Sequence, residues 1–187
     1  MSEIKKLYVI DWVGPFRSLD EADRISKAGV GSFYIVTGQL APNCKEKGIK
    51  YIGISGRDPR VRMREKDDIA KMSKIFCKEY WIGRFSVSDY NEFGQAPDPK
   101  RKKAELIENL LVRYIALLRG ADSIINKKKT YCDPIEPVVI ISRGEMKDSD
   151  YLRCNKPAAL KDLPDVLMYV DGDFYASDKL QYRFESE

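Results

Sequence analysis

The chain has 187 residues, enough for one domain of ordinary size with a modest extension and a buried hydrophobic core. It carries 33 Lys and Arg, 29 Asp and Glu and no His, so enzymes that need a catalytic or zinc-bound histidine are excluded. No apolar run approaches the roughly 20 residues of a membrane helix, the N-terminus is unlike a signal peptide, and the four cysteines form no C-x-x-C pair. We therefore expect a cytoplasmic protein with reduced thiols and no membrane partner.

Charge is distributed unevenly along the chain. Residues 131–187 carry 7 Lys and Arg against 12 Asp and Glu, a net charge of −5. Residues 1–130 carry the other 26 and 17, a net charge of +9. Because a basic surface attracts polyanions, the N-terminal two thirds of the chain is the candidate partner for a nucleic acid.

The first elements are a strand and a short helix. Residues 6–13 are rich in β-branched and aromatic residues, which predicts a strand that the following Gly-Pro pair should end. Ser18 and Glu21 have the spacing of a capping box, in which the Ser side chain accepts a hydrogen bond from the Glu21 backbone N–H. A helix is therefore expected over about residues 19–28.

A hairpin and a second helix should follow. Residues 32–36 and 49–54 predict two strands joined by a polar loop, which is typical of an antiparallel hairpin with a long connection. Asp58 followed by Pro is a typical start of a helix. Apolar residues then recur at helical spacing: Val61, Ile69, Met72 and Phe76.

The rest of the chain predicts strands around one long helix. Residues 79–88 alternate as a strand does, and residues 99–118 predict the strongest helix. We expect one face of that helix to be apolar: Leu106, Leu110, Tyr114 and Leu117. Residues 138–142 and 166–170 predict two more strands, and Asp171-Gly172 predicts a tight turn into a last one.

Four residues in these elements could carry chemistry. Tyr34 and Tyr51 lie in the two hairpin strands, where alternate residues of neighbouring strands share a face. Arg62 falls in the first turns of the next helix, where a guanidinium and a helix N-terminus both favour phosphate. Glu108 lies near the edge of the apolar face of the long helix, where a carboxylate is either a solvated charge or a metal ligand.

The order of these residues resembles that of the GIY-YIG endonuclease family. The chain has S-F-Y in the first hairpin strand, Y-I-G in the second, an Arg on the next helix, L-I-E-N-L-L in the long helix, and an Asn in I-I-N-K-K-K. The resemblance covers about residues 31–127. It implies a metal-dependent endonuclease that hydrolyses DNA phosphodiester bonds with Mg²⁺ or Mn²⁺. Gly53 would give the close packing that the second motif needs.

The resemblance also implies a role for each residue. Tyr34 would act as a general base or position the attacking water, and Tyr51 would orient the water or the phosphate. Arg62 would bind the phosphate and stabilise its developing charge. Glu108 would bind the divalent metal ion, and Asn126 would support the site after the last core helix.

The sequence departs from the family pattern at three places. The first triplet is S-F-Y in place of G-I-Y, and the second motif is followed by about one extra residue, so Arg60 or Arg64 could replace Arg62. Some members carry a histidine one turn after the arginine, where this chain has Lys66. Basic residues beside the motifs are candidate DNA contacts. These residues are Arg57, Arg60, Arg64, Lys66, Lys102, Lys127 and Lys128.

These elements predict an α+β fold with a small antiparallel sheet, similar to a GIY-YIG core, flanked by helices. Residues 31–130 would form this core, and residues 1–30 would pack a strand and a helix on it. Residues 131–187 would add an acidic, β-rich extension. The sequence leaves a homodimer open, because one active site of this kind cuts one strand.

Three alternatives stay open. A protein with these motifs could bind nucleic acid without cutting it. Asp133, Glu145 and Lys147 match the loose D…E-x-K spacing of a different metal-nuclease fold, although that pattern is short and frequent. Glu105, one turn before Glu108 on the same helix, is a rival metal ligand.

Overall fold

In the computed structural model, the described residues are 6–25, 32–44, 46–55, 61, 63–85, 100–126, 137–143 and 157–178. The strands within them are β1 (Lys6–Phe16), β2 (Ser32–Gln39), β3 (Gly48–Ser55), β4 (Phe76–Phe85), β5 (Val138–Arg143), β6 (Val166–Val170) and β7 (Asp173–Ser177). The helices are α1 (Leu19–Ile25), α3 (Lys66–Met72) and α4 (Lys100–Arg119). Two short 3-10 turns are η1 (Ala121–Ser123) and η3 (Ala158–Leu160).

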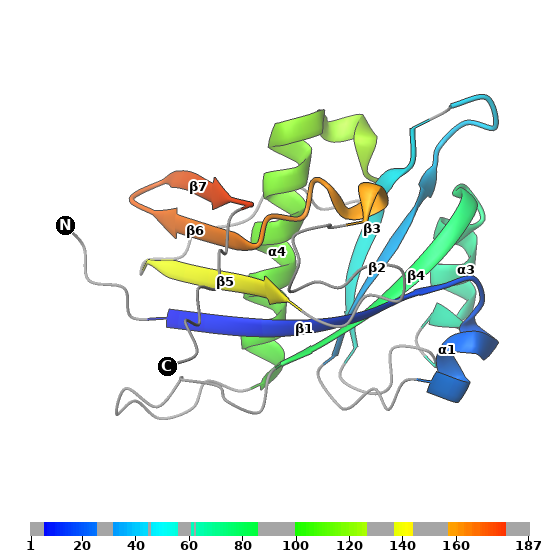
Figure 1. The fold of residues 1–187 in the computed structure, drawn as a ribbon, viewed down its shortest axis with the longest axis horizontal. Coiled ribbons are helices and arrows are strands. Elements are labelled where there is room, and N and C mark those ends of the chain that lie inside the picture. Colours follow the sequence, from blue (N-terminus) through cyan, green and yellow to red (C-terminus); the bar gives the residue numbers. More distant parts are fainter. Residues whose placement is uncertain are drawn as a thin grey trace, which may run out of the picture.

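The strands form one mixed sheet in the order β3-β2-β4-β1-β5-β6-β7, which curls around α4 (Figure 1). The first strand lies in the middle of this sheet. β1 pairs antiparallel with β4 and parallel with β5, so that Ile10 faces Phe85 on one side and Ser142 on the other. The expectation of a small antiparallel sheet flanked by helices is therefore wrong. Alternation along a segment predicts a strand, but the strands with which it pairs are set by contacts far away in the sequence.

The three predicted segments contribute to this one sheet. β1 belongs to residues 1–30, β2 to β4 belong to residues 31–130, and β5 to β7 belong to residues 131–187. The division into a core with two additions stays a prediction.

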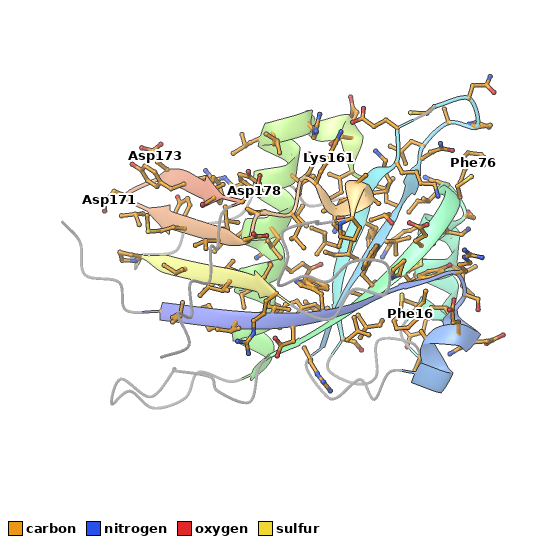
Figure 2. All side chains as sticks on the ribbon, viewed as in Figure 1. Phe16, Phe76, Lys161, Asp171, Asp173 and Asp178 are labelled. Carbon is orange, nitrogen blue, oxygen red and sulfur yellow. The ribbon has the colours of Figure 1, made fainter. Side chains whose placement is uncertain are left out.

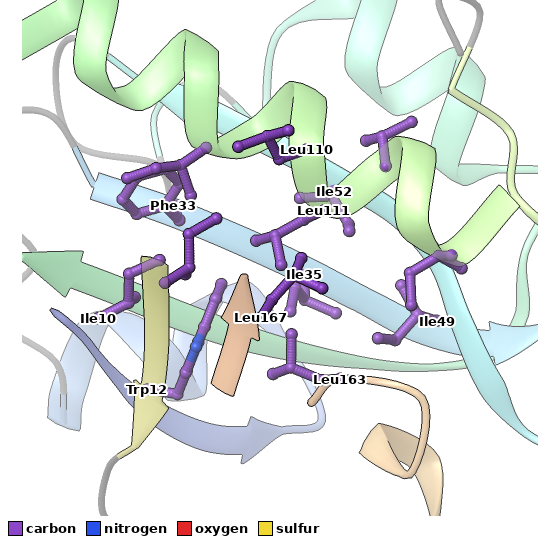
Figure 3. Packing of buried hydrophobic residues seen from close by; sticks show 14 of the residues in the cluster. Ile10, Trp12, Phe33, Ile35, Ile49, Ile52, Leu110, Leu111, Leu163 and Leu167 are labelled. Atoms are coloured by element: carbon purple, nitrogen blue, oxygen red, sulfur yellow. The ribbon is translucent and has the colours of Figure 1, made fainter. Parts of the chain in front are cut away.

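The larger core lies between the sheet and α4 (Figure 3). Alternate residues of the strands point into it, as the two-residue period of a strand requires. Figure 3 labels members of this core from four strands, from α4 and from the segment after η3: Ile10, Trp12, Phe33, Ile35, Ile49, Ile52, Leu110, Leu111, Leu163 and Leu167. The intervening residues of β2 and β3 point to the opposite face.

That opposite face carries a second, smaller core with side chains from α1 and α3. Its buried members are Phe16, Ala22, Tyr34, Val36, Tyr51, Met63, Met72, Ile75 and Ile82. The central strands β2 and β4 are therefore covered on both faces, with α4 on one side and the short helices on the other. This arrangement explains why β2 is buried from Phe33 to Gln39 without a break.

Helix α4 buries most of its predicted face, since Leu110 is 3% exposed and Leu106 and Tyr114 are partly buried against the core. Ile107, Leu111 and Ile115 are at most 1% exposed, whereas Leu117, expected on the buried face, is 67% exposed. Apolar residues surround much of this helix, so several stripes have similar hydrophobicity and the sequence does not select one of them. No helix among the described residues is long and apolar enough to cross a membrane.

Several local predictions are confirmed. The Glu21 N–H donates to Ser18 Oγ at 3.0 Å, as a capping box requires, and Glu21 Oε2 accepts at 2.7 Å from the N–H of Arg17, one residue before the N-cap. β2 and β3 form the expected antiparallel hairpin. The turn between β6 and β7 places Asp171 and Gly172 at φ values of 52° and 95°, as a tight turn with two positive φ angles requires.

Other boundaries differ from the prediction. β1 continues through the Gly14-Pro15 pair to Phe16, with an irregular register beyond Val13. Phe76 begins β4 and does not extend the preceding helix. The predicted helix start at Asp58 lies outside the described residues.

Candidate functional site

The two motif tyrosines lie next to each other on the sheet face that α1 and α3 cover. Their ring centroids are 5.8 Å apart, with an angle of 40° between the rings. Tyr34 is 1% exposed and Tyr51 is 7% exposed. The expectation that the hairpin brings both phenols to one face is therefore confirmed.

The register of the hairpin explains this contact. Tyr51 is paired with Val36, and Tyr34 is paired with Gly53, so the two tyrosines are diagonal neighbours on adjacent strands. The phenol ring of Tyr34 lies directly over Gly53. A Cβ atom at position 53 would lie 2.4 Å from Tyr34 Cζ and 2.5 Å from its hydroxyl oxygen. The glycine of the second motif is thus what leaves room for the tyrosine of the first.

Asn126 fixes the strand that carries Tyr51. Its side-chain oxygen accepts from the Ile52 N–H at 3.1 Å, and its amide nitrogen donates to the Ile52 carbonyl at 2.7 Å. The N–H of Ile125 also donates to the Lys50 carbonyl at 2.8 Å. The segment after η1 therefore makes hydrogen bonds to backbone groups on the outer edge of β3, which is the last strand at one end of the sheet. Asn126 is 7% exposed, so both bonds are protected from water.

Glu108 belongs to the helix on the other face of the sheet. It lies one turn from Ala104 and one turn from Val112, both buried in the α4 core, and is itself half-buried. The structure thus brings Tyr34, Tyr51 and Asn126 to one strand pair, while Glu108 lies on an element that packs behind that pair.

No three His, Cys, Asp or Glu side chains gather closely enough to hold a metal ion within the part of the chain that the structure describes. A single carboxylate still suits Mg²⁺, which keeps several of its waters and is often held by one or two carboxylates together with substrate phosphate. The donor chemistry of Glu108 therefore fits this ion, although the other ligands would come from water and substrate.

Most of the predicted basic residues lie outside the described residues. This holds for Arg57, Arg60, Arg62, Lys127 and Lys128, and for the side chains of Lys66 in α3 and Lys102 in α4. Arg64 is described: it is exposed and its guanidinium lies 2.9 Å from the Asp20 carboxylate. An exposed pair of this kind is weak and can exchange partners.

Two residues near the tyrosine pair were not predicted from the sequence. The Lys71 ammonium lies 5.6 Å from the centre of the Tyr51 ring. Tyr80 pairs with Val36 across β2 and β4, so it faces the same side as Tyr51, and burial raises the pKa of its phenol. Neither has a local sequence signal, because both reach the tyrosines through the strand register and the packing of α3.

Comparisons with protein-family models, with curated proteins and with solved structures find no match to this chain.

Proposed function

We propose that this protein is a GIY-YIG-type endonuclease that binds DNA and hydrolyses its phosphodiester bonds at the face that carries Tyr34 and Tyr51. The observation that carries the proposal is the tyrosine pair itself. The centroids of the two phenol rings are 5.8 Å apart, and one ring packs on Gly53, where a larger residue would clash with it. This arrangement is more specific than apolar packing needs. Their place in a motif order that resembles this family gives the pair its proposed chemistry.

In this proposal, the Tyr51 hydroxyl orients the attacking water, and Tyr34 acts as the general base or holds the water in line; Tyr51 is the more exposed residue of the two. Arg62 neutralises the non-bridging oxygens of the phosphate. Lys71 adds positive charge beside Tyr51, where the DNA backbone would approach. Glu108 would hold Mg²⁺ or Mn²⁺, which when bound supplies Lewis-acid stabilisation of the phosphate.

A second candidate function is a nucleic-acid-binding module that does not cut. One observation favours it: Tyr34 is 1% exposed, and Glu108 lies on a helix that packs on the opposite face. Cutting would require DNA binding to expose the phenol and bring the carboxylate into reach. Binding alone would require neither change.

Nicking of supercoiled plasmid DNA with Mg²⁺ or Mn²⁺ separates the two functions. We expect the wild type to nick, and Tyr51→Phe, Tyr34→Phe and Glu108→Gln to lose about 100-fold or more in rate. Each change removes one functional group and keeps the size of the side chain. Tyr80→Phe is the matched control, because it removes a phenol hydroxyl on the same face, and this hydroxyl has no proposed role in cutting.

The outcomes are distinct. Binding of duplex DNA with no nicking under either metal ion would support the module and exclude the nuclease. Nicking that survives Glu108→Gln at the wild-type rate would refute the assignment of the metal ligand. Equal losses in Tyr80→Phe and Tyr51→Phe would show that both act through stability alone.

Location and assembly belong to the same proposal. A DNA substrate and reduced thiols suit the cytoplasm. One site cuts one strand, so a homodimer should produce linear plasmid together with nicked plasmid. The ratio of linear to nicked plasmid, measured at increasing protein concentration, tests for the homodimer.

A further inference from the structure

A pocket of about 500 Å³ lies away from the tyrosine pair, where the β2–β3 loop, β4 and the η3 segment meet. Pro15, Trp81 and the stretch Pro157–Ala159 give it apolar walls. Trp81 belongs to the core on the α4 face, whereas Tyr34 and Tyr51 belong to the core on the other face. Its volume is within the range of about 300–1,000 Å³ that is usual for small-molecule sites.

The polar part of the pocket consists of two ion pairs. Lys161, labelled in Figure 2, contacts the carboxylate of Glu46. In the second pair, the Lys47 ammonium lies 3.4 Å from the Glu79 carboxylate. The four charged groups therefore cancel, and two cations and two anions surround an apolar space.

Glu79 is held loosely for a carboxylate that is only 25% exposed. Its contact with Lys47 is 3.4 Å long, and the Thr37 hydroxyl lies 3.5 Å from its other oxygen. Charge-assisted hydrogen bonds normally measure about 2.7–2.9 Å, so a closer donor would bind this carboxylate better. Thr37 is fixed behind it, because the buried Trp81 indole N–H donates to its hydroxyl at 3.1 Å.

We propose that this pocket binds a small zwitterion: a molecule with one ammonium group and one carboxylate on an apolar body, as in a free apolar amino acid. Such a ligand can replace the loose Lys47–Glu79 pair without a net change in charge. Its ammonium takes the place of Lys47 at Glu79, and its carboxylate binds the released Lys47. A ligand with only one charge makes only one of these two contacts, and a carboxylate alone would also leave the partly buried Glu79 without Lys47.

The apolar body fits the walls that the ion pairs leave. Pro15, Ala158 and Ala159 offer carbon surface beside the charged groups. The η3 segment that forms one wall is anchored by Leu160 and Leu163, which are at most 1% exposed. This wall of the pocket is therefore held in place by the α4 core.

The test is titration of ¹⁵N-labelled full-length protein with L-phenylalanine and L-leucine, followed by the amide shifts of Lys47, Glu79 and Ala158. We expect saturable shifts, with phenethylamine and 3-phenylpropanoate binding at least about tenfold more weakly, because each lacks one charged contact. Glu79→Gln should weaken the amino acids by at least about tenfold as well.

Glu65→Gln serves as the matched control. It removes another half-buried carboxylate, at the start of α3 and outside the pocket lining, and should leave the affinity unchanged. The absence of saturable shifts with both amino acids would overturn the proposal, as would equal affinity of the single-charge analogues. Plasmid nicking is a separate measurement, so failure of the nuclease proposal would leave this result standing.

Discussion

Close packing between Tyr34 and Gly53 is the residue-scale feature on which the candidate site depends. The sequence predicts two phenols on one face of the hairpin, because strand alternation is a local signal, and the family resemblance implies close packing at Gly53; the register of the hairpin makes Tyr34 its partner. The Lys71 and Tyr80 neighbours could not be predicted in the same way. Lys71 reaches Tyr51 through the packing of α3. Tyr80 reaches the tyrosine pair through the register between β2 and β4, two strands that pair residues about 40 positions apart.

Gly53→Ala should destabilise the protein by about 1–3 kcal/mol, because the new methyl group would overlap the Tyr34 ring and strand backbone cannot easily move away. In a Tyr34→Val background the ring is absent, so the same substitution should cost much less. Urea unfolding of the four proteins in this cycle measures the coupling. Equal costs in both backgrounds would mean that the glycine is required for a reason other than the phenol.

Helix α4 shows what was predictable at the scale of an element. Its predicted range, 99–118, agrees closely with Lys100–Arg119, because helix formers without Pro or Gly fill this stretch. One residue of its predicted face, Leu117, was assigned wrongly, since the limits of the buried stripe are set by the sheet that the helix contacts.

A pair of leucines on this helix tests the observed face. Leu111→Ala should destabilise the protein by about 2–5 kcal/mol, because Leu111 is 0% exposed in the main core. Leu117→Ala, at a position 67% exposed, should change stability by less than about 0.5 kcal/mol. Chemical denaturation of both variants measures this difference. A larger loss in the Leu117 variant would restore the face expected from the sequence.

The η3 segment has an electrostatic contact that should depend on pH. The hydrogen bond from Lys161, and then its positive charge, hold the pKa of the Glu46 carboxyl below its ordinary value of 4.5. A carboxyl with a lowered folded-state pKa contributes stability above its unfolded pKa, and that contribution disappears as pH falls through the folded value.

Lys161→Met should therefore lower the Tm slightly near pH 7 and have no effect once pH falls below the lowered pKa of Glu46. The effect should be small, since Glu46 is exposed, and it should shrink in about 1 M NaCl. Thermal unfolding of both proteins across this pH range provides the measurement. A Tm difference that persists in acid would indicate loss of packing by the Lys161 side chain.

At the scale of the whole molecule, the sheet order was not predictable. Each strand has a local pattern, but β1 is placed between β4 and β5 by contacts such as Tyr8 with Ile140. The C-terminal strands therefore complete the sheet on which β1 depends. Figure 2 shows their hairpin, with Asp171 and Asp173, at the end of the molecule away from Phe16 and Phe76.

A chain that ends at residue 136 should fail to unfold cooperatively, because removal of β5 to β7 exposes one edge of β1 and opens the α4 core. A chain that ends at residue 172 loses, among the described strands, the edge strand β7 alone and should keep a cooperative transition at a lower Tm. Circular dichroism during heating distinguishes the two. Cooperative unfolding of the shorter chain would show that residues 131–187 are a true addition to a core.

The central position of β1 also has a kinetic consequence. Of the described strands this one is made before the others, and β4 can pair with it once residue 85 has left the ribosome, but its other edge stays open until residues 138–143 follow. At about 5–20 residues per second, translation leaves that edge of β1 without a partner strand for several seconds. Nascent chains of this protein should therefore need chaperone protection during synthesis. The synthesis of β5 determines when the second edge of β1 is paired and can no longer aggregate.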